Sequence, residues 1–507
     1  MNMSLLGVDI GITGVKAVAF DETGRQLASA YEEYSLLFPS PGARELDPRQ
    51  VIEAACRVIQ SAASQTNDPV AAIGIASQGE AFTPVMADGR MIGNTMIFSD
   101  ARAEPYVRPW SESFGPEGSG RGAERAYRIT GHIPYTMYSL FKFLWLKDYQ
   151  PDVWASAWKF LFFEDLLAWV LTGETKTDYT MAARTMMFDV TKKVWSPEIM
   201  ETVGLTPDRL PEIISSGGIV GTVKKDMALS LGLPANATVS VCGHDQPVGA
   251  LGCGAAFPGK ASYSIGTVEC VCAAVDRLIM SPELMVANLV IYPHVVPNTY
   301  TTQGFNATGG SVLKWVRDNF ATQEASEAHA RGEDPYERII SAASDQPANV
   351  MLLPHFGPTG TPHLDPKGAG VLFGLKLSTS RAEVLQAFLE GITYEMRWNL
   401  SILSNAGFRL DELRAVGGGA RSETWMQIKA DILGIPLTTM KVTEATCMGA
   451  AILAGNRVGE SWAEPIRTFE PRREFASMYE DRFAIYKEIY SSLAKAREML
   501  DELNVER

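Results

Sequence analysis

The sequence predicts an α/β protein built from two similar domains. At 507 residues, of which 46% are hydrophobic, the chain is long enough for two or more domains with cores of their own. Glycine-rich or polar loops follow predicted strands in three places, Asp9 to Thr13, Asp245 to Thr267 and Gly417 to Arg421. Because such loops recur in both halves, we expect an internal duplication, with residues 1–248 and 249–507 as the two domains.

Charge and composition exclude several classes of protein. The net charge of −14 leaves no basic surface for nucleic acid or for an anionic membrane, so neither partner is expected. The most apolar stretch, residues 160–171, is interrupted by Glu164 and Asp165 and is too short to span a bilayer. The start of the chain does not resemble a signal peptide, and we expect a cytoplasmic location. The six cysteines lack the paired spacing of zinc sites, so we expect them to be reduced.

The first loop lies between two predicted strands in residues 5–20, where glycine alternates with β-branched residues. Asp9 lies where the first strand reaches the turn. Gly11, Thr13 and Gly14 leave room for a ligand to approach the backbone. A carboxylate suits a hard cation and turn amides suit anions, which predicts a magnesium-phosphate site. The alternative is an ordinary hairpin with an incidental aspartate.

Polar residues also follow the next two strands of the first half. One strand covers residues 71–75, and a second ends near residues 96–98. Because α/β sheets bind ligands at their strand ends, these residues are candidates for hydrogen bonds to a polyhydroxy substrate. The alternative is that they form salt bridges with one another. The candidates are Gln78, Glu80, Asp100 and Arg102.

The central stretch places a carboxylate and a glycine-hydroxyl turn at successive strand ends. A predicted strand over residues 238–242 leads to Asp245, and Pro247 is expected to start a short helix. A second strand, residues 261–265, leads directly into Gly266-Thr267. Phosphoryl transfer needs a base near the attacking hydroxyl and backbone amides near the phosphates. This spacing therefore favours a phosphoryl-transfer enzyme.

The third loop, residues 417–421, lies between a strand and a helix that runs through Ile432. Glycine there lets the backbone lie against a base or ribose, which is typical of a nucleotide site. The small-residue helix over residues 444–454 is expected to pack tightly beneath that nucleotide. The proline- and glycine-rich residues 351–375 are expected to form a loop over a cleft.

Taken together, these motifs resemble the sugar kinases of the FGGY carbohydrate kinase family, within the actin-like ATPase superfamily. The resemblance implies two RNase H-like domains, with ATP and sugar meeting in the cleft between them. Ile12, Phe98 and Val268 depart mildly from the family pattern. The resemblance covers nearly the whole chain and rests on these motifs: Asp9-Ile-Gly-Ile-Thr13 with Lys16, residues 42–48, Gln78, Phe98-Ser-Asp-Ala-Arg102, Gly243 to Gln246, Ser264-Ile-Gly-Thr267, residues 417–425, and Ala430-Asp431.

The resemblance also implies roles for individual residues. Asp245 would be the catalytic base, and Asp9 and Asp245 would hold Mg²⁺. The expected partner is a small sugar or polyol, with a homodimer as a further option. ATP would be contacted by loop residues of both halves: Asp9, Gly11, Thr13, Lys16, Gly266, Thr267, Gly310, Gly418 and Gly419. The acceptor would be bound by polar residues at strand ends: Gln78, Glu80, Asp100, Arg102 and Gln246.

The acceptor itself is less clearly indicated. Residues 417–425 and Asp100-Ala-Arg102 look most like xylulose kinases, which favours a ketopentose such as xylulose. Glu80 and the Asp245-Gln246 pair look like glycerol kinases, which favours a polyol such as glycerol or an erythritol-like tetritol. A further alternative is a non-catalytic ATP-binding regulator of the same fold. Loss of the base would be its simplest signature, and Asp245 is present.

Overall fold

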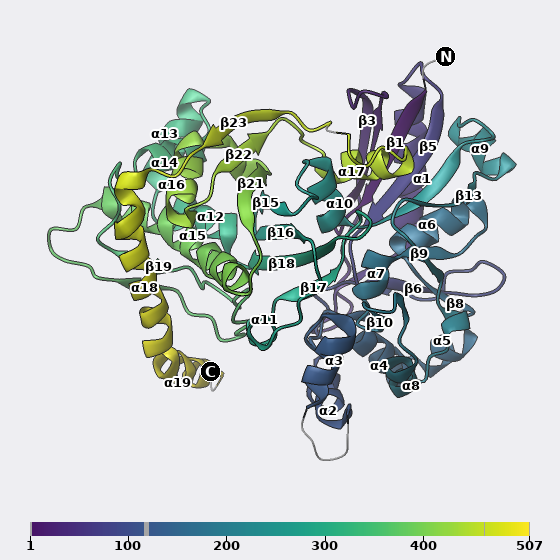
Figure 1. The fold of residues 1–507 in the computed structure, drawn as a ribbon, viewed down its shortest axis with the longest axis horizontal. Coiled ribbons are helices and arrows are strands. Elements are labelled where there is room, and N and C mark those ends of the chain that lie inside the picture. Colours follow the sequence, from purple (N-terminus) through teal and green to yellow (C-terminus); the bar gives the residue numbers. More distant parts are fainter. Residues whose placement is uncertain (1–2, 116–120, 461, 506–507) are drawn as a thin grey trace.

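Two large sheets organise the molecule (Figure 1), and the computed structural model describes residues 3–115, 121–460 and 462–505. The first sheet has the order β13-β14-β5-β1-β2-β3. Its strands are β1 (Ser4–Ile10), β2 (Gly14–Phe20), β3 (Gln26–Glu33), β5 (Val70–Ser77), β13 (Gly218–Thr222) and β14 (Thr238–His244). The second sheet has the order β17-β18-β16-β15-β21-β22-β23. Its strands are β15 (Gly259–Ile265), β16 (Glu269–Val275), β17 (Val290–Pro293), β18 (Tyr300–Asn306), β21 (Leu410–Val416), β22 (Leu437–Met440) and β23 (Pro465–Phe469).

The two sheets repeat one connection pattern. In the first, β1 pairs antiparallel with β2 and parallel with β5, and β5 pairs parallel with β14. In the second, β15 pairs antiparallel with β16 and parallel with β21, and β21 pairs parallel with β22. This repetition confirms the expected internal duplication and the two-domain α/β fold. Parallel neighbours end at the same sheet edge, so each half gathers its strand-end loops in one place.

Helix α1 (Pro48–Ser64) shows how local sequence sets an element. The Asp47 side chain accepts a hydrogen bond from the backbone nitrogen of Arg49, and Pro48 occupies the first helical position. The buried face of α1 packs on β2 and β3.

The predicted helical region after residue 103 contains α2 (Glu104–Ser113), α3 (Gly122–Thr130), α4 (Ser139–Tyr149), α5 (Pro151–Ser156), α6 (Phe163–Thr172), α7 (Tyr179–Ala183) and α8 (Pro197–Val203), and α9 (Lys225–Leu231) follows. Short strands in this half are β4 (Glu45–Leu46), β6 (Phe82–Val85), β7 (Thr95–Met96), β8 (Lys159–Phe162), β9 (Lys176–Asp178), β10 (Phe188–Asp189), β11 (Val194–Trp195) and β12 (Glu212–Ile214).

Helices α10 (Asp245–Gly252) and α17 (Ala445–Ala454) lie between the two sheets (Figure 1). Helix α17 packs against α10, β1 and β5, so a late segment of the chain covers the first sheet. The approach requires glycine, because a Cβ on Gly74 would lie 2.1 Å from the carbonyl oxygen of Ala450. The sequence predicted that this helix packs tightly beneath the nucleotide; in the structure it packs tightly on the first sheet. The expected division at residue 248 falls inside α10.

The second half contains the long helix α15 (Arg381–Asn405), which begins with a capping box between Ser380 and Glu383. The irregular stretch expected at residues 351–375 contains two short paired strands, β19 (Met351–Leu353) and β20 (Val371–Phe373). In the described part of the chain, none of the helices combines the length and apolar character needed to cross a membrane. The remaining helices are α11 (Pro282–Val286), α12 (Gly309–Asn319), α13 (Thr322–Arg331), α14 (Pro335–Ser341), α16 (Glu423–Leu433), α18 (Ala476–Ser492) and α19 (Ala494–Val505).

Candidate active site

Three predicted site residues lie at the ends of three adjacent parallel strands of the first sheet. Asp9 lies near the end of β1, Gln78 follows β5, and Asp245 follows β14. Asp9 is in register with Ala76 of β5, and Ser77 is in register with His244 of β14. The sheet therefore brings Asp9 and Asp245 to the same edge, although 236 positions separate them in the sequence.

Each of these residues presents a buried oxygen to the same region. Asp9 Oδ1, Gln78 Oε1 and Asp245 Oδ1 have no hydrogen-bond partner among the described residues. His244 Nε2 lies 3.2 Å from Asp245 Oδ1, but outside hydrogen-bond geometry. A buried acceptor without a donor is costly, so these oxygens indicate a place for a cation or for hydroxyl donors.

Burial and the charges of neighbouring carboxylates raise the pKa values of both aspartates. For Asp245, burial is the main cause, and the charge of Glu80 adds to it, so its pKa rises to about 6. Hydrogen bonds from Gln246 act in the opposite direction. Burial also raises the pKa of Asp9 to about 8, with repulsion from Asp245 and Glu444 in addition. A carboxylate with a pKa near the working pH suits a general base.

The first loop lies beside these aspartates. The turn of Gly11 to Thr13 connects β1 and β2, with the Gly11 amide donating to the carbonyl oxygen of Gly14 at 3.0 Å. Lys16 is in register with Asp9 and forms an ion pair with Glu444, with 2.7 Å between Nζ and Oε1. The predicted phosphate lysine is thus partly neutralised by a residue just before α17.

One cavity, which we name the nucleotide cavity, is lined by residues predicted to contact the nucleotide. Its volume is about 400 Å³, and Gly266, Thr267, Gly310, Gly418 and Gly419 all line it. The Gly310 amide donates to the Gly266 carbonyl oxygen at 2.8 Å, and a Cβ on Gly310 would lie 2.5 Å from that oxygen. A Cβ on Gly418 would meet no described atom within 4 Å, so this backbone is open to a ligand.

Sequence reasoning missed part of this nucleotide cavity. Lys314, Tyr336 and Trp425 also line it. Tyr336 is on α14, 26 residues after Gly310 and outside every predicted glycine loop, so only the folded chain brings it here. Trp425 lies four residues after the predicted glycine loop, within the motif of residues 417–425, and could have been included on that ground.

Asp245 lines a different cavity, with a volume of about 340 Å³. We name it the acceptor cavity, after the ligand predicted for its residues. Gln78, Glu80 and Gln246 line it together with Asp245, as do residues of the second half such as Gln303. Val268 lines this cavity, whereas Thr267 lines the nucleotide cavity, so the two cavities adjoin at successive residues. Glu80 has a φ of 63°, a left-handed conformation that a non-glycine residue adopts only when its surroundings enforce it.

Arg184 is a charged acceptor-cavity residue that the sequence did not indicate. It follows α7, and its Nε donates to Glu80 Oε1 at 2.6 Å. Both side chains are buried, so the pair lies in a region of low dielectric where directional hydrogen bonds are strong. No motif surrounds Arg184 in the sequence, and 104 positions separate it from Glu80.

The structure does not bring Asp100 and Arg102 to the acceptor cavity. Asp100 is fully buried and accepts hydrogen bonds from Arg102 Nη2 at 2.7 Å and from the Arg44 amide at 2.8 Å. Arg102 also pairs with Glu45 and lies over the Trp145 ring, 4.2 Å from its centroid. These groups are satisfied within the protein, so they hold the loop after β7 in place. Phe98 from the same segment lines the cavity instead.

Comparison with known proteins identifies the family. The models for the N-terminal and the C-terminal domain of the FGGY family of carbohydrate kinases match residues 4–252 and 261–457. A glycerol kinase of Koribacter versatilis is 30% identical over 498 residues, which cover 92% of this chain and 94% of that protein. The chain belongs to the FGGY family of carbohydrate kinases.

Other FGGY relatives are similar over nearly their whole length. A xylulose kinase of Staphylococcus epidermidis is 28% identical over 502 residues, which cover 96% of each chain. The structure of a ligand-bound xylulose kinase from Lactobacillus acidophilus is 25% identical, with a TM-score of 0.89 over 98% of this chain and all of that one. The protein is therefore a carbohydrate kinase, a phosphotransferase that uses ATP with Mg²⁺.

The residues at the site fit both Mg²⁺ and ATP. The described residues contain no cluster of three or more His, Cys, Asp or Glu side chains that could hold a metal ion. Mg²⁺ is usually bound through one or two carboxylates together with phosphates and water. Asp9 and Asp245, each with an unpaired buried oxygen, meet that requirement, and the open backbone at Gly418 leaves space for the nucleotide.

Proposed function

We propose that this FGGY kinase transfers the γ-phosphoryl group of ATP to a hydroxyl group of a ketopentose such as xylulose. The observation that supports the reaction best is the set of three unpaired buried oxygens on Asp9, Gln78 and Asp245, of which Gln78 and Asp245 line the acceptor cavity, next to the nucleotide cavity. In-line transfer needs this arrangement, because the attacking hydroxyl and the phosphate must approach from two sides.

Asp245 would act as the general base. With a pKa of about 6 it is mostly ionised at neutral pH, and its unpaired Oδ1 can accept the proton of the acceptor hydroxyl. Bound Mg²⁺ would neutralise phosphate charge, with Asp9 and Asp245 as the residues that hold it. The backbone around Gly266 and Thr267 lines the nucleotide cavity and would position the phosphates.

The acceptor would be oriented by the polar side of its cavity. Glu80 and Arg184 form a fixed ion pair there, and Gln246 adds an amide. A site built to bind hydroxyl groups rejects analogues that leave its buried polar groups unpaired. Relatives named xylulose kinase, aligned over 96% of the chain, favour a ketopentose.

A polyol such as glycerol or erythritol is the second candidate acceptor. Glu80 and Gln246 in the cavity support it, and relatives named glycerol kinase are 30% identical to this chain. Both candidates have adjacent hydroxyl groups, and they differ in the carbonyl group and in length. The cavity residues therefore have to be tested with substrates directly.

The test is ADP release with Mg-ATP across ketopentoses, ketohexoses, tetritols and glycerol, with Asp245→Asn alongside. The proposal expects one preferred ketopentose, with turnover reduced by about 10² to 10⁴ in the variant, as for a lost general base. ATP binding should be nearly unchanged in that variant. Preference for glycerol or a tetritol would replace the acceptor proposal. No turnover above the variant with any acceptor would favour a non-catalytic ATP-binding regulator.

A further inference from the structure

The loop between β19 and β20, residues 354–370, forms one wall of the acceptor cavity. Thr361 and Leu364 of this loop line the cavity, together with Phe305 and Asn288. The Phe305 amide donates to Thr361 Oγ1 at 2.8 Å. Asn288 Nδ2 donates to the carbonyl oxygen of Pro362, also at 2.8 Å. The loop is thus hydrogen-bonded to its neighbours in the same wall, and its position sets the shape of the cavity.

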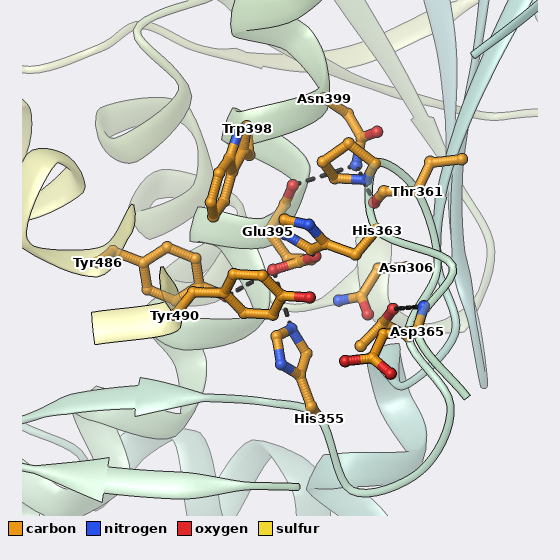
Figure 2. A network of polar contacts seen from close by, with 12 residues as sticks. Asn306, His355, Thr361, His363, Asp365, Glu395, Trp398, Asn399, Tyr486 and Tyr490 are labelled. Atoms are coloured by element: carbon orange, nitrogen blue, oxygen red, sulfur yellow. Dashed lines mark hydrogen bonds and ion pairs between the residues drawn. The ribbon is translucent and has the colours of Figure 1, made fainter. Parts of the chain in front are cut away.

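A buried carboxylate on α15 holds this loop from behind (Figure 2). Glu395 is fully buried, and its Oε2 accepts hydrogen bonds from Tyr486 Oη at 2.6 Å and from His355 Nε2 at 3.1 Å. His363 Nε2 lies 3.8 Å from the other oxygen, Oε1. His355 and His363 flank Thr361 in the loop, so Glu395 faces the loop on both sides of its cavity residue.

The charge on Glu395 depends on these neighbours. Burial alone would raise the pKa of Glu395, but attraction to His355 and His363 and the hydrogen bonds from His355 and Tyr486 keep it below its usual value. The carboxylate is therefore ionised at neutral pH, and hydrogen bonds to a charged group are stronger than neutral ones. It lies outside both the nucleotide and the acceptor cavity lining, so the phosphoryl transfer itself does not use it.

Further contacts complete the support behind the loop. The His363 ring stacks on Tyr490 of α18, with 3.8 Å between centroids, and Asn399 Nδ2 of α15 donates to the Thr361 carbonyl oxygen at 2.7 Å. Arg497 of α19 lies 3.9 Å from Asp365. In Figure 2 Thr361 and Asp365 lie to the right of Glu395, His355 lies below it, and the α18 tyrosines Tyr486 and Tyr490 lie to its left. The last two helices of the described chain therefore act on the acceptor wall through this cluster.

We propose that Glu395 is a positioning residue that sets acceptor specificity. Its hydrogen bond to His355 anchors the start of the loop, and its Oε1 lies 3.8 Å from His363 Nε2, so it holds Thr361 and Leu364 where they shape the acceptor cavity. The inference rests on the proposed kinase function. It predicts that loss of the Glu395 carboxylate changes the KM for the acceptor and not the KM for ATP, because no residue of the loop lines the nucleotide cavity.

The test compares Glu395→Gln with Glu390→Gln. A glutamine at 395 keeps the volume but removes the charge that strengthens the hydrogen bonds from Tyr486 and His355, and it puts an NH₂ group in place of one carboxylate oxygen. Glu390 is a matched control, because it is equally buried on the same helix and accepts from Tyr479 Oη of α18 at 3.3 Å. Its other described partners are Gln386 and the Ala348 amide, which lie outside the loop.

For Glu395→Gln we expect the acceptor KM to rise about tenfold, with the ATP KM changed by less than about twofold. Glu390→Gln should leave both constants within about twofold of wild type, although both variants lose thermal stability. Hydrogen exchange should become faster in residues 354–370 only in Glu395→Gln. If that variant does not fold, Tyr486→Phe removes a single hydrogen bond to Glu395 and should shift the acceptor KM in the same direction.

Equal rises of the acceptor and ATP KM in Glu395→Gln would overturn the inference, as would an equal acceptor effect in Glu390→Gln. Wild-type protein without turnover on any acceptor would refute the kinase proposal, but hydrogen exchange would still test whether Glu395 anchors the loop. Unchanged exchange of residues 354–370 in Glu395→Gln would refute that anchoring.

Discussion

Replacing Asp9 by Asn should stabilise the nucleotide-free protein while it weakens catalysis. Burial, together with repulsion from Asp245 and Glu444, raises the pKa of Asp9 from 3.8 to about 8. Its Oδ1 lacks a hydrogen-bond partner among the described residues. The folded protein therefore holds a carboxyl group in a place that disfavours its charge, and folding at neutral pH requires proton uptake.

The magnitude follows from the linkage between pH and stability. Between the ordinary pKa of 3.8 and pH 7 lie 3.2 pH units, and at about 1.36 kcal/mol each this amounts to about 4 kcal/mol of lost stability at pH 7. Asp9 is only partly buried as a residue, so solvent screening reduces the expected gain in Asp9→Asn to about 2 to 4 kcal/mol.

The sign of the pH dependence makes this prediction specific. The folded-state pKa of Asp9 is raised, so its unfavourable effect grows as pH rises from 3.8 to about 8. The stability difference between Asp9→Asn and wild type should therefore shrink to about 1.6 kcal/mol or less at pH 5. Nucleotide-dependent stabilisation, about 2.7 kcal/mol at 100 times Kd, should be largely lost in the variant.

The assay is urea unfolding without nucleotide at pH 5 and pH 7, with Asp21→Asn as the control. Asp21 lies in the turn after β2, where burial is outweighed by hydrogen bonds from Thr23 and Arg25 that lower its pKa to about 2. Its replacement should destabilise the protein at pH 7, opposite to Asp9→Asn. A variant at Asp9 that is no more stable than wild type at pH 7, or equally stabilised at both pH values, would refute the reasoning.

Three further outcomes test the site. The acceptor kcat/KM should fall tenfold per pH unit below about 6, because Asp245 is then protonated; a flat profile down to pH 5 would contradict its role as base. Glu80→Gln should raise the acceptor KM more than the ATP KM, since it weakens the ion pair with Arg184; equal changes would mean a structural role. Gly418→Ala should unfold like wild type, because the added methyl group meets no described atom within 4 Å, but it should raise the ATP KM; an unchanged ATP KM would place the nucleotide elsewhere.

Residues with a local signal were predictable from the sequence. Asp9 and Asp245 lie at the ends of buried strands, and Gly266, Gly310 and Gly418 lie in short glycine-containing motifs that follow strands, so strand periodicity and glycine placement located them. The predicted convergence of these loops also had a physical basis, because parallel strands of a duplicated unit end at one edge of their sheet.

Residues whose role depends on distant packing were not predictable in the same way. Asp100 and Arg102 follow a strand, as Gln78 does, yet the backbone beyond that strand turns them toward Glu45 instead of the cavity. The partner of Glu80 is 104 positions away, and the ion pair between Lys16 and Glu444 joins residues 428 positions apart. Pairing at such separations is decided by the global fold.

The sequence by itself therefore determined the family, the duplicated α/β architecture and the loops that bear the proposed reacting groups, because each of these is encoded in short-range patterns of strands and glycines. Only the tertiary structure decided that α17 packs on the first sheet, that Arg184 faces Glu80, and that Glu395 supports the acceptor wall. Those features depend on which apolar and polar surfaces come into contact after folding, and no local pattern specifies that contact.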